Sequence, residues 1–138
     1  MRETEQARRH VLVVEDDADN AALLADVLEG RGYAVTIAYD GEDALDEIRR
    51  RRPDLVTLDI QMPRMTGTLF YRRMKTDRTL RDVPVIVVTG LTRDDANMEL
   101  LIRSLLEVDH LPAPEAYLEK PVDGRTLLET AARLLPPS

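Results

Sequence analysis

Acidic residues follow two apolar runs of the sequence, at the point where each run ends. The first run, 11–14, is followed directly by Glu15, Asp16 and Asp17, and the second run, 55–58, is followed directly by Asp59. If both runs are neighbouring buried strands, these carboxylates meet at one edge of a sheet, where like charges repel and raise one another's proton affinity. A divalent cation removes that conflict, and oxygen-only ligands favour magnesium or calcium. The sequence therefore predicts an acidic pocket that holds a hard metal ion beside a reactive aspartate.

The elements that must position these acids follow from the spacing of apolar residues. Five strands, each followed by a helix, are predicted at 11–14, 33–38, 55–58, 85–88 and 116–118. Continuous apolar runs are typical of strands that are covered on both faces, and the run 33–38 alternates less cleanly, which places it nearer an edge. The clearest helical pattern is Met98, Leu101, Ile102, Leu105 and Leu106. This order predicts an α/β protein whose parallel sheet carries helices on both faces.

Two further strand ends bring polar side chains to the same edge. Thr89 follows the predicted fourth strand, and Lys120 and Pro121 follow the fifth. In such sheets ligands bind beyond the carboxyl ends of the strands. Four strand ends therefore deliver acids, a hydroxyl and an amine to one place.

Length and composition exclude several classes of protein. The 138 residues fit one domain with its own core. The balance of 19 basic and 26 acidic residues gives −7, which disfavours direct binding of nucleic acid. There is no cysteine, which fits a cytoplasmic protein, and no apolar stretch long enough for membrane insertion. The one basic cluster, the arginines at 49–52, is interpreted as a solvated helix end favoured by the helix dipole.

Four segments together resemble the receiver domain of bacterial response regulators. They are VLVVEDD, LVTLDIQMPRMTG, VIVVTG and YLEKP, in the order and spacing of that family from residue 10 to residue 135. The resemblance implies a single doubly wound (βα)5 sheet of flavodoxin-like strand order 2-1-3-4-5 in three layers, α/β/α. It also implies that residues 10–138 form the receiver domain and that residues 1–9 are a flexible N-terminal tail.

The resemblance assigns a role to each acid of the pocket. Asp59 matches the phosphoryl-accepting carboxylate. Mg²⁺ would be held by Asp16 directly, by Glu15 through a water, by Asp59 itself and by the backbone carbonyl of Gln61. Glu15 stands where the family more often has aspartate. Asp17 lies one residue past the matching pair, and we interpret it as an N-terminal charge on the first helix.

The same resemblance implies how the signal is formed. Lys120 would bring its ammonium to the phosphoryl oxygens, aimed by a cis bond to Pro121, and Thr89 would donate its hydroxyl. Tyr117 matches the aromatic that swings inward with the threonine, although a static packing role stays open. This switch would re-form the surface of the fourth helix, fifth strand and fifth helix, a face through which this chain could also form a homodimer.

The expected partners are a sensor histidine kinase or histidine phosphotransfer protein as phosphoryl donor and an unknown downstream protein. The only catalysis expected is the protein's own phosphorylation and dephosphorylation. The segment 107–114 replaces the usual Gly-Ala pair and falls in the output surface. A tolerated insertion and a specificity loop are both open for it, and His110 is interpreted as a surface histidine.

Other readings of the same residues differ in class. A single-domain regulator is expected rather than a fragment of a hybrid kinase. A metal-dependent phosphatase with an aspartyl-phosphate intermediate would need an acid where Gln61 stands, and it usually carries a cap. A simple magnesium or calcium buffer is disfavoured by Lys120. A degenerate receiver is disfavoured by the presence of Asp59, Asp16 and Thr89.

Overall fold

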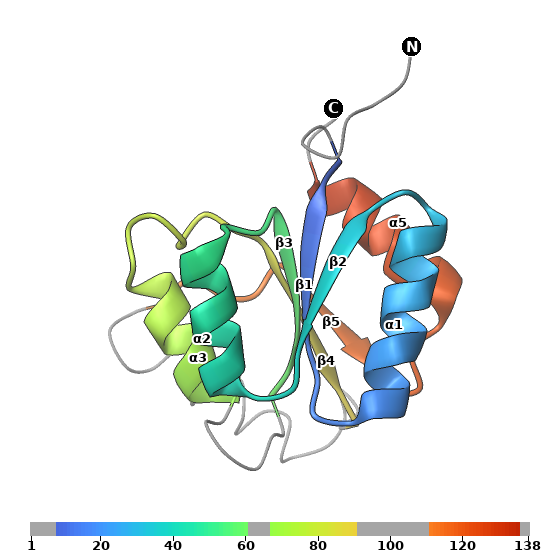
Figure 1. The fold of residues 1–138 in the computed structure, drawn as a ribbon, viewed down its shortest axis with the longest axis horizontal. Coiled ribbons are helices and arrows are strands. Elements are labelled where there is room, and N and C mark those ends of the chain that lie inside the picture. Colours follow the sequence, from blue (N-terminus) through green and yellow to red (C-terminus); the bar gives the residue numbers. More distant parts are fainter. Residues whose placement is uncertain (1–7, 61–66, 91–110, 136–138) are drawn as a thin grey trace.

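The apolar runs form one parallel sheet in the computed structural model, which describes residues 8–60, 67–90 and 111–135 (Figure 1). The strand order is β2-β1-β3-β4-β5, which confirms the predicted order and places β2 at an edge. The strands are β1 (His10–Val14), β2 (Ala34–Ala38), β3 (Leu55–Asp59), β4 (Val85–Thr89) and β5 (Ala116–Glu119). The last three strands each end one residue later than predicted, so Asp59, Thr89 and Glu119 are themselves paired within the sheet.

Helices cover both faces of this sheet, as predicted. In Figure 1, α1 and α5 pack on one face, and α2 and α3 pack on the other. Their bounds are α1 (Ala18–Gly30), α2 (Gly41–Arg50), α3 (Gly67–Lys75) and α5 (Gly124–Leu134). The helix predicted around 98–106 and the N-terminal residues 1–7 lie outside the described residues.

Three of the helices begin at an aspartate that caps them. The side chains of Asp17, Asp40 and Asp123 accept hydrogen bonds from backbone N–H groups three residues later, at 3.0, 2.8 and 3.0 Å. Such caps satisfy donors that the first turn leaves unpaired. Asp17 therefore starts α1 as its N-cap, and its carboxylate is engaged at the helix rather than in the acidic pocket.

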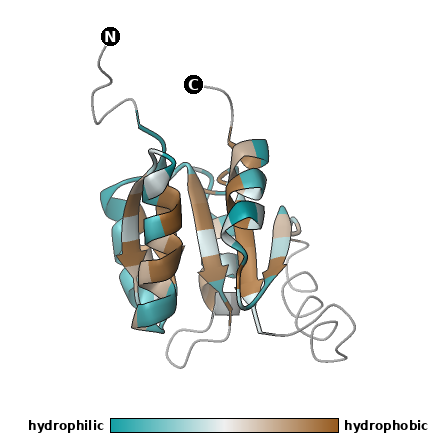
Figure 2. Cartoon of the chain, turned by 90° about the vertical axis from the view of Figure 1, so that its right-hand side faces the viewer, coloured by the Kyte–Doolittle hydropathy of each residue, from teal (hydrophilic) through white to brown (hydrophobic). Residues whose placement is uncertain are grey.

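Alternate residues of each strand point to opposite faces, which explains why the runs are apolar throughout. Leu12, Val14, Val56, Leu58 and Val87 pack with α2 and α3 in one cluster. Val11, Val13, Leu55, Ile86 and Val88 pack with α1 and α5 in the other. Figure 2 shows the strands as largely hydrophobic and the helices as hydrophilic on their outer sides. The central strands are thus packed between two cores, and the candidate site lies at their carboxyl ends.

A buried lysine links the end of α3 to the segments that precede β4 and β5. The Nζ of Lys75 donates hydrogen bonds to the carbonyls of Val83 at 2.7 Å and Arg81 at 3.0 Å, and it lies 3.7 Å from Oε1 of Glu115. The other oxygen of Glu115 accepts from the backbone N–H of Val85 at 2.6 Å. Burial lowers the pKa of Lys75, and the charge of Glu115 partly offsets this. The sequence pattern contains no sign of this network, because Lys75 and Glu115 are 40 positions apart.

The same region receives the end of the unusual segment 107–114. Its described part, 111–114, has Leu111 in the core beside α2 and α3, and Pro114 is buried. The hydroxyl of Tyr71 in α3 donates a hydrogen bond to the carbonyl of Pro112. This end of the segment is therefore anchored in the fold, while residues 107–110 lie outside the described residues.

Candidate functional site

The strand register brings the predicted acids together. Val14 of β1 pairs with Leu58 of β3, so the next residues, Glu15 and Asp59, lie side by side at the carboxyl edge of the sheet. Carboxylate oxygens of Glu15, Asp16 and Asp59 all lie within 4.8 Å of one another. Glu15 and Asp59 are buried, whereas Asp16 is exposed at the rim. Three of the four acids that follow the two apolar runs thus form one cluster, and Asp17 caps α1 instead, as its place one residue past the matching pair predicts.

Lys120 reaches this cluster from the end of β5. Its backbone N–H donates to the carbonyl of Thr89 at 2.8 Å, which extends the pairing of β4 and β5. Its Nζ lies 2.7 Å from Oε1 of Glu15 and 3.1 Å from Oδ2 of Asp59. The bond between Lys120 and Pro121 is cis, the geometry that the family resemblance implies. One ammonium therefore bridges two buried carboxylates.

The electrostatics of the cluster follow from this crowding. Burial, and to a lesser degree the hydrogen bond with Asp59, raise the pKa of Glu15 to about 7, while Lys120 opposes the shift. Burial lowers the pKa of Lys120, but hydrogen bonds to Glu15 and Asp59 outweigh that effect and raise it. The site thus has more buried negative charge than its single ammonium neutralises, which is an arrangement that a cation relieves.

We expect this excess charge to show in the pH dependence of stability. Because the pKa of Glu15 is raised from 4.5 to about 7, the folded state holds a proton that the unfolded chain releases between these values. Glu15 therefore stabilises the fold below pH 4.5 and loses that contribution as the pH rises through about 7. The effect of Glu15→Gln on the unfolding free energy, measured without divalent metal, should therefore differ between the two ends of this range. At about pH 8 the substitution should be more favourable than at about pH 5, by on the order of 2 kcal/mol.

Urea unfolding of wild type and Glu15→Gln at both pH values checks this prediction. Their difference isolates Glu15 from other titrating groups, such as His10, whose pKa is lowered by burial. Glu29→Gln, at an exposed acid of α1, is the matched control and should follow the wild type. Parallel stability profiles for wild type and Glu15→Gln would contradict the raised pKa.

The remaining predicted side chains lie on the neighbouring strands. Thr89 ends β4 at the same sheet edge, and it is buried. Tyr117 lies in β5 and pairs with Val87, which precedes Thr89 by two residues in β4. Its side chain packs against the core beside α2 and α3. It is half-buried, and burial raises its pKa. Gln61 lies outside the described residues, so its carbonyl stays a prediction.

Gly67 belongs to the site although the sequence marks it only as part of a loop. It begins α3 and is buried against the end of β3. A Cβ atom at this position would lie 2.8 Å from the carbonyl oxygen of Asp59 and closer still to the Cα of Ile60. Only glycine permits this approach of α3 to the backbone that carries Asp59. The signal available in the sequence was a glycine at the start of a helical pattern, where it is otherwise unfavourable.

No helix among the described residues combines the length and the apolar character that crossing a bilayer requires.

Comparisons with known proteins agree with this geometry. Residues 11–132 match the family model described as the response regulator receiver domain. The polar-differentiation response regulator DivK of Brucella anthropi is 35% identical over 122 residues, which are 88% of this chain and 92% of that protein. The DivK of Brucella ovis is 34% identical over the same shares.

Solved structures show the same fold. The chemotaxis protein CheY4 of Vibrio cholerae superposes with a TM-score of 0.80 at 28% identity, over 94% of this chain and all of that one. The signal receiver domain of a signal transduction histidine kinase from Syntrophus aciditrophicus gives a TM-score of 0.78 at 29% identity, covering 92% and 89%. With the acidic cluster, the bridging lysine and these matches in place, the chain belongs to the response regulator receiver family.

Proposed function

We propose that Asp59 is the residue that accepts the phosphoryl group in this receiver. The observation that carries the proposal is the burial of its carboxylate 3.1 Å from the ammonium of Lys120 and beside the acids of β1. In the transfer, a carboxylate oxygen of Asp59 forms a bond to phosphorus as the bond from phosphorus to the donor imidazole nitrogen breaks. The donor ring, protonated on its second nitrogen before the transfer, keeps the bonding pair and leaves as neutral imidazole, and the product is an acyl phosphate.

Oxygen ligands of the site fit a magnesium ion. Asp16 and Asp59 are proposed as direct ligands, Glu15 as a ligand through a water, and the backbone carbonyl of Gln61 as a further ligand. The crowding of three carboxylates within 4.8 Å supports this donor set, since a cation relieves their repulsion. When bound, the ion supplies positive charge that offsets repulsion between the carboxylates and the incoming phosphoryl oxygens.

The other residues act on the phosphoryl group once it is attached. Lys120 pairs with Asp59 and Glu15 in this structure, and we propose that it re-pairs with a phosphoryl oxygen as charge builds up there. Thr89 would donate its hydroxyl to a second oxygen. The resulting shift of Thr89 would let Tyr117 move inward from its half-buried position in β5. This two-state change is the proposed signal.

Receiver domains interact with phosphoryl donors and with downstream proteins. For this chain we propose a sensor histidine kinase or histidine phosphotransfer protein as the donor and a protein target as the reader. A homodimer through the face formed with β5 and α5 is a further proposal. A cytoplasmic location is proposed as well, which a chain without cysteine fits. The proposed catalysis is confined to the protein's own phosphorylation and dephosphorylation.

Phosphorylation by a small donor tests the proposed function. Acetyl phosphate with Mg²⁺ should add one phosphoryl group to the chain by intact mass, and addition of EDTA should prevent it. A metal-dependent phosphatase would instead turn over p-nitrophenyl phosphate many times without requiring a protein partner. Sustained ester hydrolysis without a mass increase would contradict the receiver mechanism.

The metal ligands can be tested separately from phosphorylation. Asp16→Ala should weaken Mg²⁺ binding by on the order of 1.5–3 kcal/mol, because it removes a charge-assisted contact. Asp17→Ala should change it less, because the Asp17 side chain caps α1 by accepting from the N–H of Asn20. Titration with Mg²⁺, followed by NMR shifts of residues at the sheet edge, measures both. A larger loss for Asp17→Ala would mean that the ligand register after β1 is wrong by one residue.

A further inference from the structure

Charge is distributed unevenly along the chain. The segments 49–54 and 72–82 contain nine basic and three acidic residues, whereas the remainder contains ten basic and 23 acidic residues. The first segment is the end of α2 with the connection to β3, and the second is the end of α3 with the connection to β4. Both connections lead into the starts of strands, so they lie at the sheet edge opposite Asp59. The acidic protein therefore carries one basic end.

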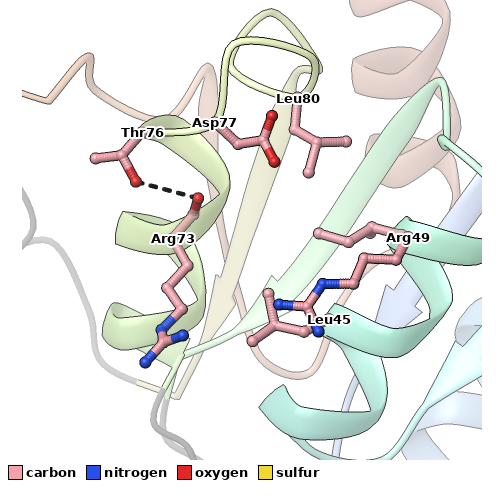
Figure 3. Close-up of a pocket in the computed structure, with 7 residues that line it drawn as sticks. Leu45, Arg49, Arg73, Thr76, Asp77 and Leu80 are labelled. Atoms are coloured by element: carbon pink, nitrogen blue, oxygen red, sulfur yellow. Dashed lines mark hydrogen bonds between the residues drawn. The ribbon is translucent and has the colours of Figure 1, made fainter.

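The two basic segments are joined to each other. The Nε of Arg52 donates a hydrogen bond to the carbonyl of Thr79 at 2.8 Å, which links the connection after α2 with the connection after α3. Between the two helices lies a hollow of about 450 Å³, which we call the α2–α3 hollow (Figure 3). It is lined by Leu45, Ile48, Arg49, Arg73, Thr76, Asp77 and Leu80.

The lining combines an apolar floor with a cationic rim. Leu45, Ile48 and Leu80 belong to the core cluster, and only a small part of each reaches the hollow. Arg49 and Arg73 are exposed and come from the two facing helices in Figure 3. Within the described part of the chain, neither guanidinium has a carboxylate at salt-bridge distance. Two exposed cations thus flank the small apolar floor, and Arg49 also lies within electrostatic range of Asp77.

The polar groups between them are already engaged. The Thr76 hydroxyl donates to the carbonyls of Arg72 and Arg73 at 2.9 and 3.2 Å. The Oδ1 of Asp77 accepts from the N–H and the hydroxyl of Thr79 at 2.9 and 2.7 Å. These contacts engage the Thr76 hydroxyl and one oxygen of Asp77, so the two arginines supply the positive charge of the hollow.

We propose that the α2–α3 hollow binds an acidic segment of a partner protein. An aliphatic side chain of that segment would cover the floor, and its flanking carboxylates would pair with Arg49 and Arg73, whose planar guanidinium groups match carboxylates. The acidic remainder of the chain opposes the long, uniformly charged backbone of a nucleic acid more than a short acidic segment that is confined to the hollow. A concave site between helices also offers little to a flat lipid surface.

The position of the hollow has a functional meaning of its own. Because it lies at the starts of the strands, an occupant leaves the edge that carries Asp59 and Lys120 open. A phosphoryl donor and the acidic segment could therefore be bound at the same time. The inference does not depend on the role proposed for Asp59, and it can be tested with unphosphorylated protein.

Binding can be followed by NMR of ¹⁵N-labelled protein. The probe is a short peptide of alternating glutamate and leucine, and the comparison probes are the same peptide with glutamine for glutamate, single-stranded DNA and vesicles containing phosphatidylglycerol. The acidic peptide should shift the signals of Leu45, Arg49, Arg73 and Thr76. Arg49→Gln combined with Arg73→Gln should weaken its binding at least about tenfold. Arg125→Gln with Arg133→Gln, at exposed arginines of α5, is the matched control and should not.

Each outcome decides the proposal. Shifts confined to the hollow, lost in the Arg49→Gln and Arg73→Gln variant and absent with the glutamine peptide, support it. No shift with the acidic peptide, or equal binding by that variant, overturns it. Tighter binding of DNA or vesicles than of the peptide overturns the choice of occupant. A ¹⁵N spectrum of the double variant as dispersed as that of the wild type shows that it is folded.

Discussion

Asp59→Asn should abolish phosphoryl uptake, whereas the wild-type protein should gain one phosphoryl group from acetyl phosphate and Mg²⁺. An amide is a far poorer nucleophile than a carboxylate, so the acyl phosphate cannot form at this position. The substitution preserves shape in a buried site where Lys120 lies 3.1 Å from Oδ2. Glu15 still pairs with the ammonium after the change, and the site loses part of its excess negative charge. We therefore expect the variant to stay folded.

Intact mass before and after incubation with the donor measures this result. Asp46→Asn is the matched control, because it makes the same change at an exposed aspartate of α2, and it should be phosphorylated like the wild type. Uptake by Asp59→Asn equal to that of the wild type would place the acceptor elsewhere. In that case the neighbouring carboxylates, Glu15 and Asp16, would be the next positions to replace.

Among single replacements of charged residues in the described part of the chain, we expect Lys75→Ala to lower the free energy of unfolding most. The change leaves the carbonyls of Arg81 and Val83 without their donor, deprives Glu115 of its ion pair and opens a cavity. A buried acceptor left without its donor costs about 1–3 kcal/mol, and this change leaves two such carbonyls. With the cavity added, we expect the unfolding free energy to fall by about 3 kcal/mol or more.

Urea unfolding of matched variants separates the ionic network from helix propensity. Arg73→Ala, at an exposed position of the same helix, should change stability by less than about 0.5 kcal/mol. Lys75→Met combined with Glu115→Gln should recover part of the loss, since it restores volume and keeps an acceptor for the N–H of Val85. A loss below about 1 kcal/mol for Lys75→Ala would mean that water replaces the ammonium at low cost.

The sheet could be predicted from the sequence because each strand is recognised from its own residues. Continuous apolar runs mark central strands, and residues that follow such runs must lie at the carboxyl edge, so the spacing alone places Asp59, Thr89 and Lys120 together. Contacts between segments that share no pattern cannot be predicted in this way. The partnership of Lys75 with Glu115 depends on the path of residues 111–115, and nothing in the periodicity of α3 distinguishes its last lysine from a solvated one.

Gly67 was missed for a related reason. Its role depends on how closely the start of α3 approaches the carbonyl of Asp59, and that distance is set by the packing of Phe70 and Met74 against the sheet. The arginine run at 49–52 was correctly placed at a helix end, because α2 ends at Arg50. That Arg49 and Arg73 line the same hollow could not be predicted, because it depends on α2 and α3 packing side by side.

Lys75 and Lys120 are the only lysines in the chain, and every other basic residue is an arginine or a histidine. Reagents that modify amines therefore have three targets, the N-terminus and these two side chains. The side chain of Lys75 is 1% exposed and that of Lys120 is 24% exposed, so acylation of lysine within the fold should fall first on the one beside Asp59. With the role proposed for Lys120, fluorescent labelling or surface coupling through lysine should inactivate the protein. Since the chain has no cysteine, a single cysteine introduced at an exposed position of α1, such as Glu29, offers an attachment point away from Lys120 instead.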